Sequence, residues 1–211
     1  MIPLKEIISP FSLKKEDLRR HEIYRYLGFK PDSLDPIVGE KIEKNILELL
    51  SVAEIKHYGE IFPISFLGEG KIQIGALEIQ SLVLEKNLQG SECVFAFGIT
   101  LGIGVDRLIY RKDKISKADS ILVDAIAIET IETAANTLCK NLAESLEPLG
   151  YFTKPRFSPG FADYGLENQK NLLDFLQLHR RIGVGLTQGN MMIPTKSVTA
   201  LMGIHKRREQ E

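Results

Sequence analysis

The chain has 211 residues, which is enough for one large domain or two small ones. Hydrophobic residues make up 44% of it, so it can bury a core, and the formal net charge of −1 leaves no excess of basic charge for a nucleic acid or a membrane surface. Cys93 and Cys139 lie far apart without a CxxC neighbour and the four histidines are scattered, so we expect no metal site.

The chain also lacks the long apolar segments that mark export or membrane insertion. Residues 1–5 have no apolar core of the kind that a signal peptide needs, and no run of eighteen apolar residues occurs. We therefore expect a soluble protein of the cytoplasm, with no nucleic acid and no membrane among its partners.

Short helices and strands are predicted in the first half of the chain. Gly28 and Pro31 would end the first helix, and Asp35 is a suitable N-cap for the second, with Pro36 at its first position. The predicted elements are a strand at 2–8, helices at 14–27 and 35–57, and strands at 61–66, 71–74 and 94–99.

Residues 117–147 give the strongest local signal in the chain. Apolar residues recur there at steps of three and four, which predicts one apolar stripe along a single α-helix: Ile121, Ala125, Ile128, Ala135, Cys139, Leu142 and Leu146. Position 132 also lies on this stripe, but it is occupied by a charged residue, Glu132. A charged carboxylate on an apolar seam is costly unless it has a partner. Two kinds of partner are possible. One is an arginine, or water at a wet helix edge, and the position of Glu132 alone favours this interpretation. The other is the ammonium or hydroxyl group of a ligand.

Beyond this helix the pattern changes again. A loop rich in proline and glycine is predicted at 154–165, followed by a helix at 167–180 and strands at 184–187 and 197–204. Helices and strands are mixed without a regular βαβ alternation, and no repeat or flexible linker divides the chain. The sequence therefore predicts an α+β fold.

Two segments of the second half could carry chemistry. The first, 156–163, combines Arg156, whose guanidinium suits a carboxylate, with Gly160, where a ligand could approach the backbone, and the flat side chain of Phe161. Composition alone favours an ordinary surface loop. The second, 191–198, holds two methionines and Lys196, which are more often core filling and a solvated lysine.

Taken together, these segments resemble the activation domain of cobalamin-dependent methionine synthase, most closely its free-standing activation subunits. The loop 156–163 is similar to that family's arginine-x-x-proline-glycine-aromatic signature, and 192–199 to its methionine-x-proline-x-x-serine-valine-serine signature. The helix that carries Glu132 matches the family helix that presents an acid to the ligand. The segments 97–107 and 25–28 look like further shared stretches. The resemblance is clear over 90–204 and weaker over 1–89.

The resemblance implies a single mixed domain over 1–211, with a long central helix and an antiparallel-rich sheet, that binds S-adenosylmethionine. Arg156 would hold the ligand's carboxylate and Glu132 its polar amino acid end. Backbone groups around Ser158 and Gly160 would read the adenine, with Phe161 beside the ligand. Tyrosine stands at the position of Phe161 in the large synthases, so one hydroxyl contact is lost. The family's early aspartate contact has no identified counterpart here.

The activity that the resemblance implies is the reactivation of a methionine synthase. The chain would support reductive methylation of cob(II)alamin, with S-adenosylmethionine as methyl donor and cobalamin carried by a separate synthase. Met192, Lys196 and Ser197 would face that partner. A flavodoxin-like reductant is a further candidate partner. We assign no catalytic residue, because delivery of a methyl group needs positioning rather than an acid or base. Whether such an activation subunit counts as a methyltransferase stays open.

A second class of function remains open at this point. The chain could be a non-catalytic module that binds S-adenosylmethionine, or an accessory factor for another corrinoid protein.

Overall fold

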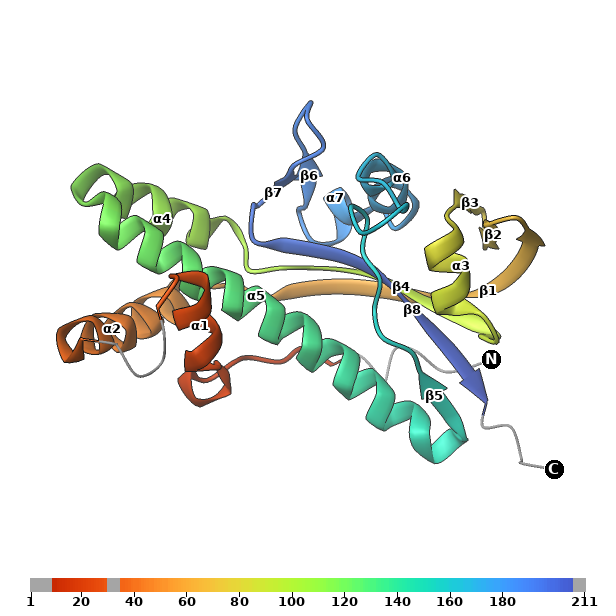
Figure 1. The fold of residues 1–211 in the computed structure, drawn as a ribbon, viewed down its shortest axis with the longest axis horizontal. Helices are drawn as coiled ribbons and strands as arrows, with labels where there is room; N and C mark the ends of the chain where they lie inside the picture. Colours follow the sequence, from red (N-terminus) through yellow and green to blue (C-terminus); the bar gives the residue numbers. More distant parts are fainter. Residues whose placement is uncertain (1–8, 30–34, 207–211) are drawn as a thin grey trace.

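A computed structural model describes residues 9–29 and 35–206. The strand predicted at 2–8 lies outside these residues. The described part forms an α+β domain with one six-stranded antiparallel sheet, in the order β3-β2-β1-β4-β8-β5, and one long helix, α5 (Figure 1). The expected fold class is therefore confirmed.

The sheet is built from long central strands and short edge strands. Its members are β1 (Lys56–Gly68), β2 (Lys71–Ile74), β3 (Leu77–Gln80), β4 (Cys93–Thr100), β5 (Tyr151–Thr153) and β8 (Ser197–Lys206). A separate two-stranded hairpin joins β6 (Gly185–Leu186) to β7 (Met192–Ile193). The predicted strand at 184–187 is thus one arm of this hairpin and not a member of the main sheet.

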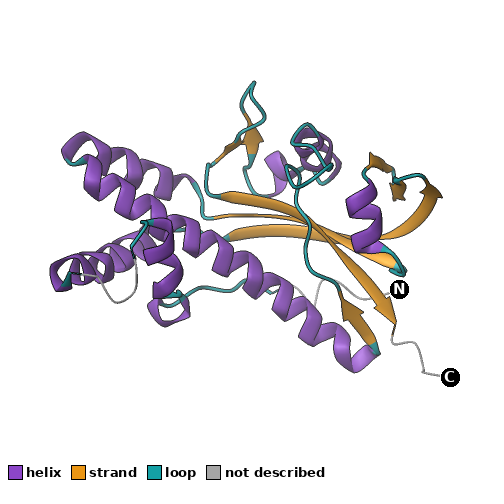
Figure 2. Ribbon diagram, viewed as in Figure 1, coloured by secondary structure: helices purple, strands orange, loops and turns teal. Residues whose placement is uncertain are grey.

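Helices cover both faces of the sheet (Figure 2). One face carries α1 (Arg20–Tyr26), α2 (Pro36–Val52), α4 (Ile103–Ile115) and α5 (Lys117–Leu146), and the other carries α3 (Leu82–Leu88), α6 (Asn168–Phe175) and α7 (Leu178–Arg181). Successive side chains of a strand point to opposite faces, so β4 serves two cores. Phe95 and Phe97 pack with the first group of helices, and Val94 and Ala96 with the second.

Several boundaries differ from the sequence prediction for identifiable reasons. The Asp35 carboxylate accepts a hydrogen bond from Ile37 N at 2.8 Å, so α2 begins where predicted, but it ends at Val52 because Lys56 already pairs with Thr100 in the sheet. The helix predicted at 167–180 is divided into α6 and α7 at Gln177, whose φ of 53° is left-handed.

Helix α5 matches its predicted range, and four members of the predicted stripe are buried: Ala125, Ala135, Leu142 and Leu146. Ile121, expected in the apolar stripe, is 54% exposed, whereas its neighbour Leu122 is buried. The fully buried carboxylate of this helix is Glu129, not Glu132. Apolar residues occupy adjacent rows of α5, so the spacing alone did not show how far around the helix the buried face extends.

Candidate functional site

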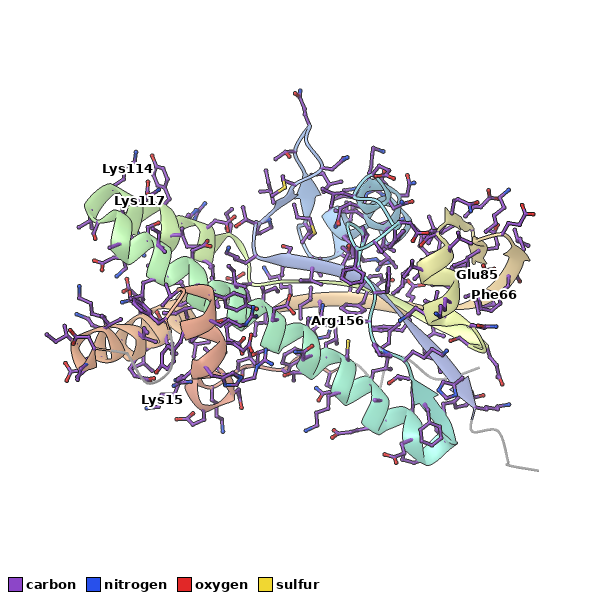
Figure 3. The ribbon with its side chains drawn as sticks, in the orientation of Figure 1. Lys15, Phe66, Glu85, Lys114, Lys117 and Arg156 are labelled. Atoms are coloured by element: carbon purple, nitrogen blue, oxygen red, sulfur yellow. The ribbon has the colours of Figure 1, made fainter. Side chains whose placement is uncertain are left out.

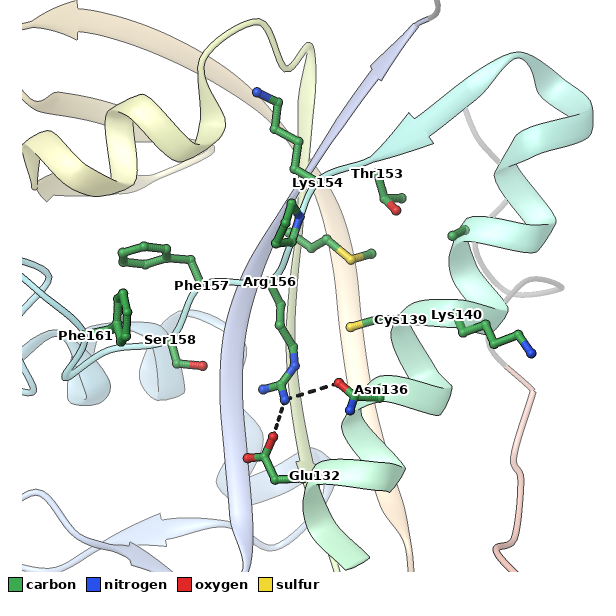
Figure 4. A pocket seen from close by; sticks show the side chains of 13 residues that line it. Glu132, Asn136, Cys139, Lys140, Thr153, Lys154, Arg156, Phe157, Ser158 and Phe161 are labelled. Carbon is green, nitrogen blue, oxygen red and sulfur yellow. Dashed lines mark hydrogen bonds and ion pairs between the residues drawn. The ribbon is translucent and has the colours of Figure 1, made fainter. Parts of the chain in front are cut away.

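A groove of about 790 Å³ runs between α5 and the segment that follows β5 (Figure 4). The lining side chains come from three places in the chain: α5, residues 153–161 and β8. The residues that line it are Glu132, Asn136, Cys139, Lys140, Ala143, Thr153, Lys154, Pro155, Arg156, Phe157, Ser158, Phe161 and Met202. This volume lies within the range of about 300–1,000 Å³ that is typical of small-molecule sites.

An ion pair joins the two walls of the groove. The guanidinium of Arg156 donates a hydrogen bond to the carboxylate of Glu132, and the same nitrogen lies 3.3 Å from Asn136 Oδ1. Figure 4 shows both acceptors projecting from α5 toward the arginine. The side chain of Arg156 is 20% exposed and that of Glu132 34%, so a ligand can reach both charges. Figure 3 places Arg156 beside the middle of α5.

Glu132 has a partner, as the sequence reasoning required, and its side chain is 34% exposed rather than sealed in the core. Its partner is an arginine at a wet helix edge, one of the alternatives that the sequence left open. The buried charge belongs to Glu129, whose side chain is inaccessible to solvent. Arg19 donates to it from its backbone N (3.1 Å), Nε (2.9 Å) and a terminal nitrogen (3.1 Å), and Thr133 Oγ1 donates at 2.8 Å. Sequence reasoning missed this pair because its members are 110 residues apart.

The loop after Arg156 forms one end of the groove. Phe157 exchanges two backbone hydrogen bonds with Leu201 of β8, at 2.8 and 2.9 Å, which fixes the start of the loop to the sheet. Gly160 has a φ of +88°, a conformation that side chains disfavour. Phe161 is 64% exposed and meets the Phe157 ring edge-on at 5.3 Å. Ser158 and Phe161 line the groove, whereas Gly160 lies outside its lining.

Cys139 contributes a thiol to the same groove. Burial raises the pKa of this thiol to about 11, and the positive charge of Arg156 opposes the shift. The thiol is thus protonated near neutral pH and acts there as a small apolar surface. Sequence reasoning placed Cys139 in the apolar stripe and gave no ligand-binding role to Cys139, Asn136 or Lys140, although 132, 136, 139 and 140 share one face of a helix and could have been found from this spacing.

The segment expected to face a partner is only partly exposed. Lys196 is 13% exposed and forms an ion pair with Asp124 of α5 at 2.7 Å. Ser197 is buried, with Oγ at 2.8 Å from Thr100 Oγ1 and 2.7 Å from the Pro194 carbonyl oxygen. Its hydroxyl is therefore bonded within the protein, and a contact of Ser197 with a partner stays a prediction.

In the 191–198 segment, the most exposed side chains lie next to Met192, one of the residues expected to face a partner. Met192 is half-buried and accepts a hydrogen bond from Gln169 Nε2 at 3.0 Å through its sulfur. Met191 and Ile193, on either side of it, are 61% and 45% exposed. A partner that meets the 191–193 segment would touch these two side chains first.

Within 9–29 and 35–206, no three side chains of histidine, cysteine, aspartate or glutamate gather as a metal site would require. None of the helices in this described part is long and apolar enough to span a bilayer.

Comparison with known proteins gives a likeness in structure only. No family model matches the sequence, and no curated protein does. Thirteen solved chains match in structure. One of them is the MetH reactivation domain, in a crystal structure bound to AdoHcy. The alignment covers 92% of this chain and 76% of that chain, with a TM-score of 0.68 and 17% sequence identity. At this identity the likeness shows that the two chains share a fold, the α+β architecture of the MetH reactivation domain.

Proposed function

We propose that this chain binds S-adenosylmethionine in the groove between α5 and the 153–161 segment, and that it supports reactivation of a cobalamin-dependent methionine synthase. The observation that carries the proposal is the ion pair Glu132–Arg156, which places one negative and one positive charge on opposite walls of an open groove. The likeness to the MetH reactivation domain bound to AdoHcy supports it, because AdoHcy is S-adenosylmethionine without its methyl group.

The two charges suit the amino acid end of this ligand. An α-amino acid brings a carboxylate and an ammonium group close together, so it can replace each member of the ion pair with its own opposite charge. Arg156 would then bind the carboxylate in a charge-assisted hydrogen bond, and Glu132 would accept from the ammonium. Asn136, which already lies near the guanidinium, would remain available to the ligand.

The rest of the ligand would lie toward the loop end of the groove. Ser158 and Phe161 line that end, and Phe161 offers an exposed aromatic surface. We propose that backbone groups near Ser158 contact the adenine. Gly160 would act indirectly, by permitting the turn rather than by lining the groove.

The proposed chemistry transfers a methyl group to cobalt on a partner protein. One electron reduces cob(II)alamin to cob(I)alamin, whose cobalt attacks the sulfonium methyl; the S–CH₃ bond breaks, a Co–CH₃ bond forms, and S-adenosylhomocysteine leaves. The task of this chain is to hold the sulfonium within near-attack distance, roughly 3–3.5 Å. Residues 1–211 would act as one domain in the cytoplasm, with Met192 and Lys196 near the partner and a flavodoxin-like protein supplying the electron.

Calorimetric titration with S-adenosylmethionine tests the binding step. We expect one site per chain, and about 1–4 kcal/mol weaker binding for Arg156→Ala, since the ligand carboxylate loses its cation while the ion pair with Glu132 no longer has to be broken. Arg111→Ala, an exposed arginine on α4, is the matched control and should bind like the parent. Absence of heat and of a thermal shift at millimolar ligand, with folded protein, would refute the proposal.

Reconstitution tests the reactivation step. Oxidised synthase from the same organism, a reductant and S-adenosylmethionine are mixed with and without this chain, and methylcobalamin is followed by absorbance. We expect faster formation with the chain present. Ligand binding without any change in this rate would favour the alternative, a non-catalytic S-adenosylmethionine-binding module or a factor for another corrinoid protein.

A further inference from the structure

The loop that forms the end of the groove is fixed at two points that are far apart in the sequence. At its start, the backbone of Phe157 pairs with Leu201 of β8. At its far end, Asp163 reaches across to the beginning of α3, about 80 residues earlier in the chain. Ser158 and Phe161, the two loop side chains proposed to meet the ligand, lie between these attachments.

The contacts of Asp163 are numerous for an exposed side chain. Ser81 Oγ donates to Asp163 Oδ1 at 2.5 Å, Leu82 N donates to Oδ2 at 2.7 Å, and Val83 N lies 3.3 and 3.4 Å from the two carboxylate oxygens. The Ser81 hydroxyl and the two backbone N–H groups hold the pKa of the Asp163 carboxyl below its ordinary value, so the group is a carboxylate at neutral pH.

Helix α3 does not depend on Asp163 for its own N-cap. The hydroxyl oxygen of Ser81 already accepts a hydrogen bond from Leu84 N at 3.0 Å, as an N-cap serine does. The carboxylate therefore adds a second set of acceptors to a helix end that is already capped. Its larger effect falls on the other partner, which is the loop.

The loop needs such an attachment because its own conformation is strained. Ala162 has a φ of +53°, a left-handed conformation that is unfavourable for a residue with a Cβ atom. Within the turn, Gly160 N donates to the Tyr164 carbonyl at 2.7 Å and Tyr164 N donates to the Phe161 carbonyl at 3.1 Å. The Tyr164 side chain is fully buried, so it keeps the loop on the protein even when Asp163 is altered.

We propose that Asp163 is a positioning residue for the ligand groove: its hydrogen bonds to the start of α3 hold the 158–161 segment in the conformation that receives the ligand. This inference rests on the proposed ligand site. It assigns to Asp163 a role in affinity rather than in the stability of the fold. Asp163 itself does not line the groove.

Two variants at the same contact separate affinity from stability. Asp163→Asn removes the charge and one acceptor but leaves the Ser81 cap, so we expect about tenfold weaker S-adenosylmethionine binding and a melting temperature close to that of the parent. Ser81→Ala removes the cap of α3 but leaves the Leu82 contact of Asp163. We expect it to lower the melting temperature by about 2–4 °C with a smaller effect on affinity.

Asp35→Asn is the matched control, because Asp35 caps α2, a helix that does not contribute to the groove. Because asparagine caps a helix about as well as aspartate, this variant should change the melting temperature little and leave the affinity unchanged. Two results for Asp163→Asn would overturn the inference. One is unchanged affinity, and the other is weaker binding accompanied by a clear fall in melting temperature. We expect Asp163→Asn to reduce affinity more than Ser81→Ala does, and Ser81→Ala to reduce stability more than Asp163→Asn does. If Asp163 only stabilised the fold, affinity and stability would fall together in both variants.

Hydrogen exchange of the ligand-free protein gives a measurement that does not need the ligand. We expect faster exchange in peptides covering 156–164 for Asp163→Asn and unchanged exchange there for Asp35→Asn. Unchanged exchange in Asp163→Asn would contradict the inference even if the parent bound no S-adenosylmethionine. Failure of the parent to bind, with faster exchange in the variant, would instead refute the proposed function and leave the attachment of the loop established.

Discussion

The ion pair between Glu132 and Arg156 leads us to predict that substitutions of these two residues have non-additive effects on ligand affinity. In the empty protein these side chains bind each other. If an amino acid zwitterion binds between them, each exchanges its partner for a ligand group, so ligand binding must first break the pair. The perturbation is Glu132→Gln, Arg156→Ala and the double variant, each measured with and without S-adenosylmethionine.

The structure sets the size of each effect. The pair is partly exposed, so its loss should cost about 1 kcal/mol or less in the free energy of unfolding, which lowers the melting temperature by about 2–4 °C in a chain of this size. A ligand charge left without its partner costs about 2–5 kcal/mol, but each single variant no longer has to break the ion pair. Glu132→Gln should therefore weaken binding by about 1–4 kcal/mol, or about 5-fold to about 1,000-fold.

The double variant distinguishes exchange from mere proximity. The parent must break the ion pair before it binds the ligand, whereas each single variant has no pair to break and is spared that cost. The double variant is also spared it, but only once, whereas the sum of the two single variants counts it twice. Its loss of affinity should thus exceed the sum of the two single losses by about 1 kcal/mol, about fivefold. Calorimetry gives the affinities, and melting without ligand gives the energy of the pair. Asp174→Asn, which breaks an exposed pair with Lys170 on α6, away from the groove, is the control.

Additive losses would mean that the ligand leaves the ion pair intact, and the exchange reasoning would be wrong. Unchanged affinity in both single variants would place the ligand elsewhere.

Three further predictions concern the surroundings of the groove. Arg19→Ala should destabilise the fold by about 3–5 kcal/mol, because it leaves the buried carboxylate of Glu129 without its cation, and a denaturant titration measures this. Alkylation of Cys139 should accelerate as pH rises toward about 11, the pKa of its thiol, and bound ligand should slow it; a rate that levels off near pH 8 would contradict the assigned burial. Phe161→Ala should weaken ligand binding while changing stability by less than about 0.5 kcal/mol, since the ring is exposed, whereas Phe157→Ala, at a buried ring, should lower the melting temperature clearly.

Much of the candidate site could be anticipated from local sequence. Arg156, Ser158 and Phe161 belong to one short segment, which composition alone favoured as an ordinary surface loop and which the family resemblance singled out; all three line the groove. Glu132 was singled out for a wrong reason, as a charge on a buried stripe, but it does line the groove.

Some residues of the site carried no local signal. Met202 reaches the groove from β8, and the hydrogen bonds between Asp163 and the start of α3 join positions about 80 residues apart. No spacing in the sequence predicts such pairs, because they meet only after the sheet has formed.

The sequence by itself determined the elements whose signals are local. The Asp35–Pro36 start of α2 and the 30-residue length of α5 follow from capping groups and from apolar spacing along the helix. The tertiary structure decided which face of α5 is buried, and therefore that Glu129 is sealed against Arg19 while Glu132 meets Arg156 at the groove. The physical reason is that burial depends on which helices and strands pack against a residue, and those partners come from distant parts of the chain.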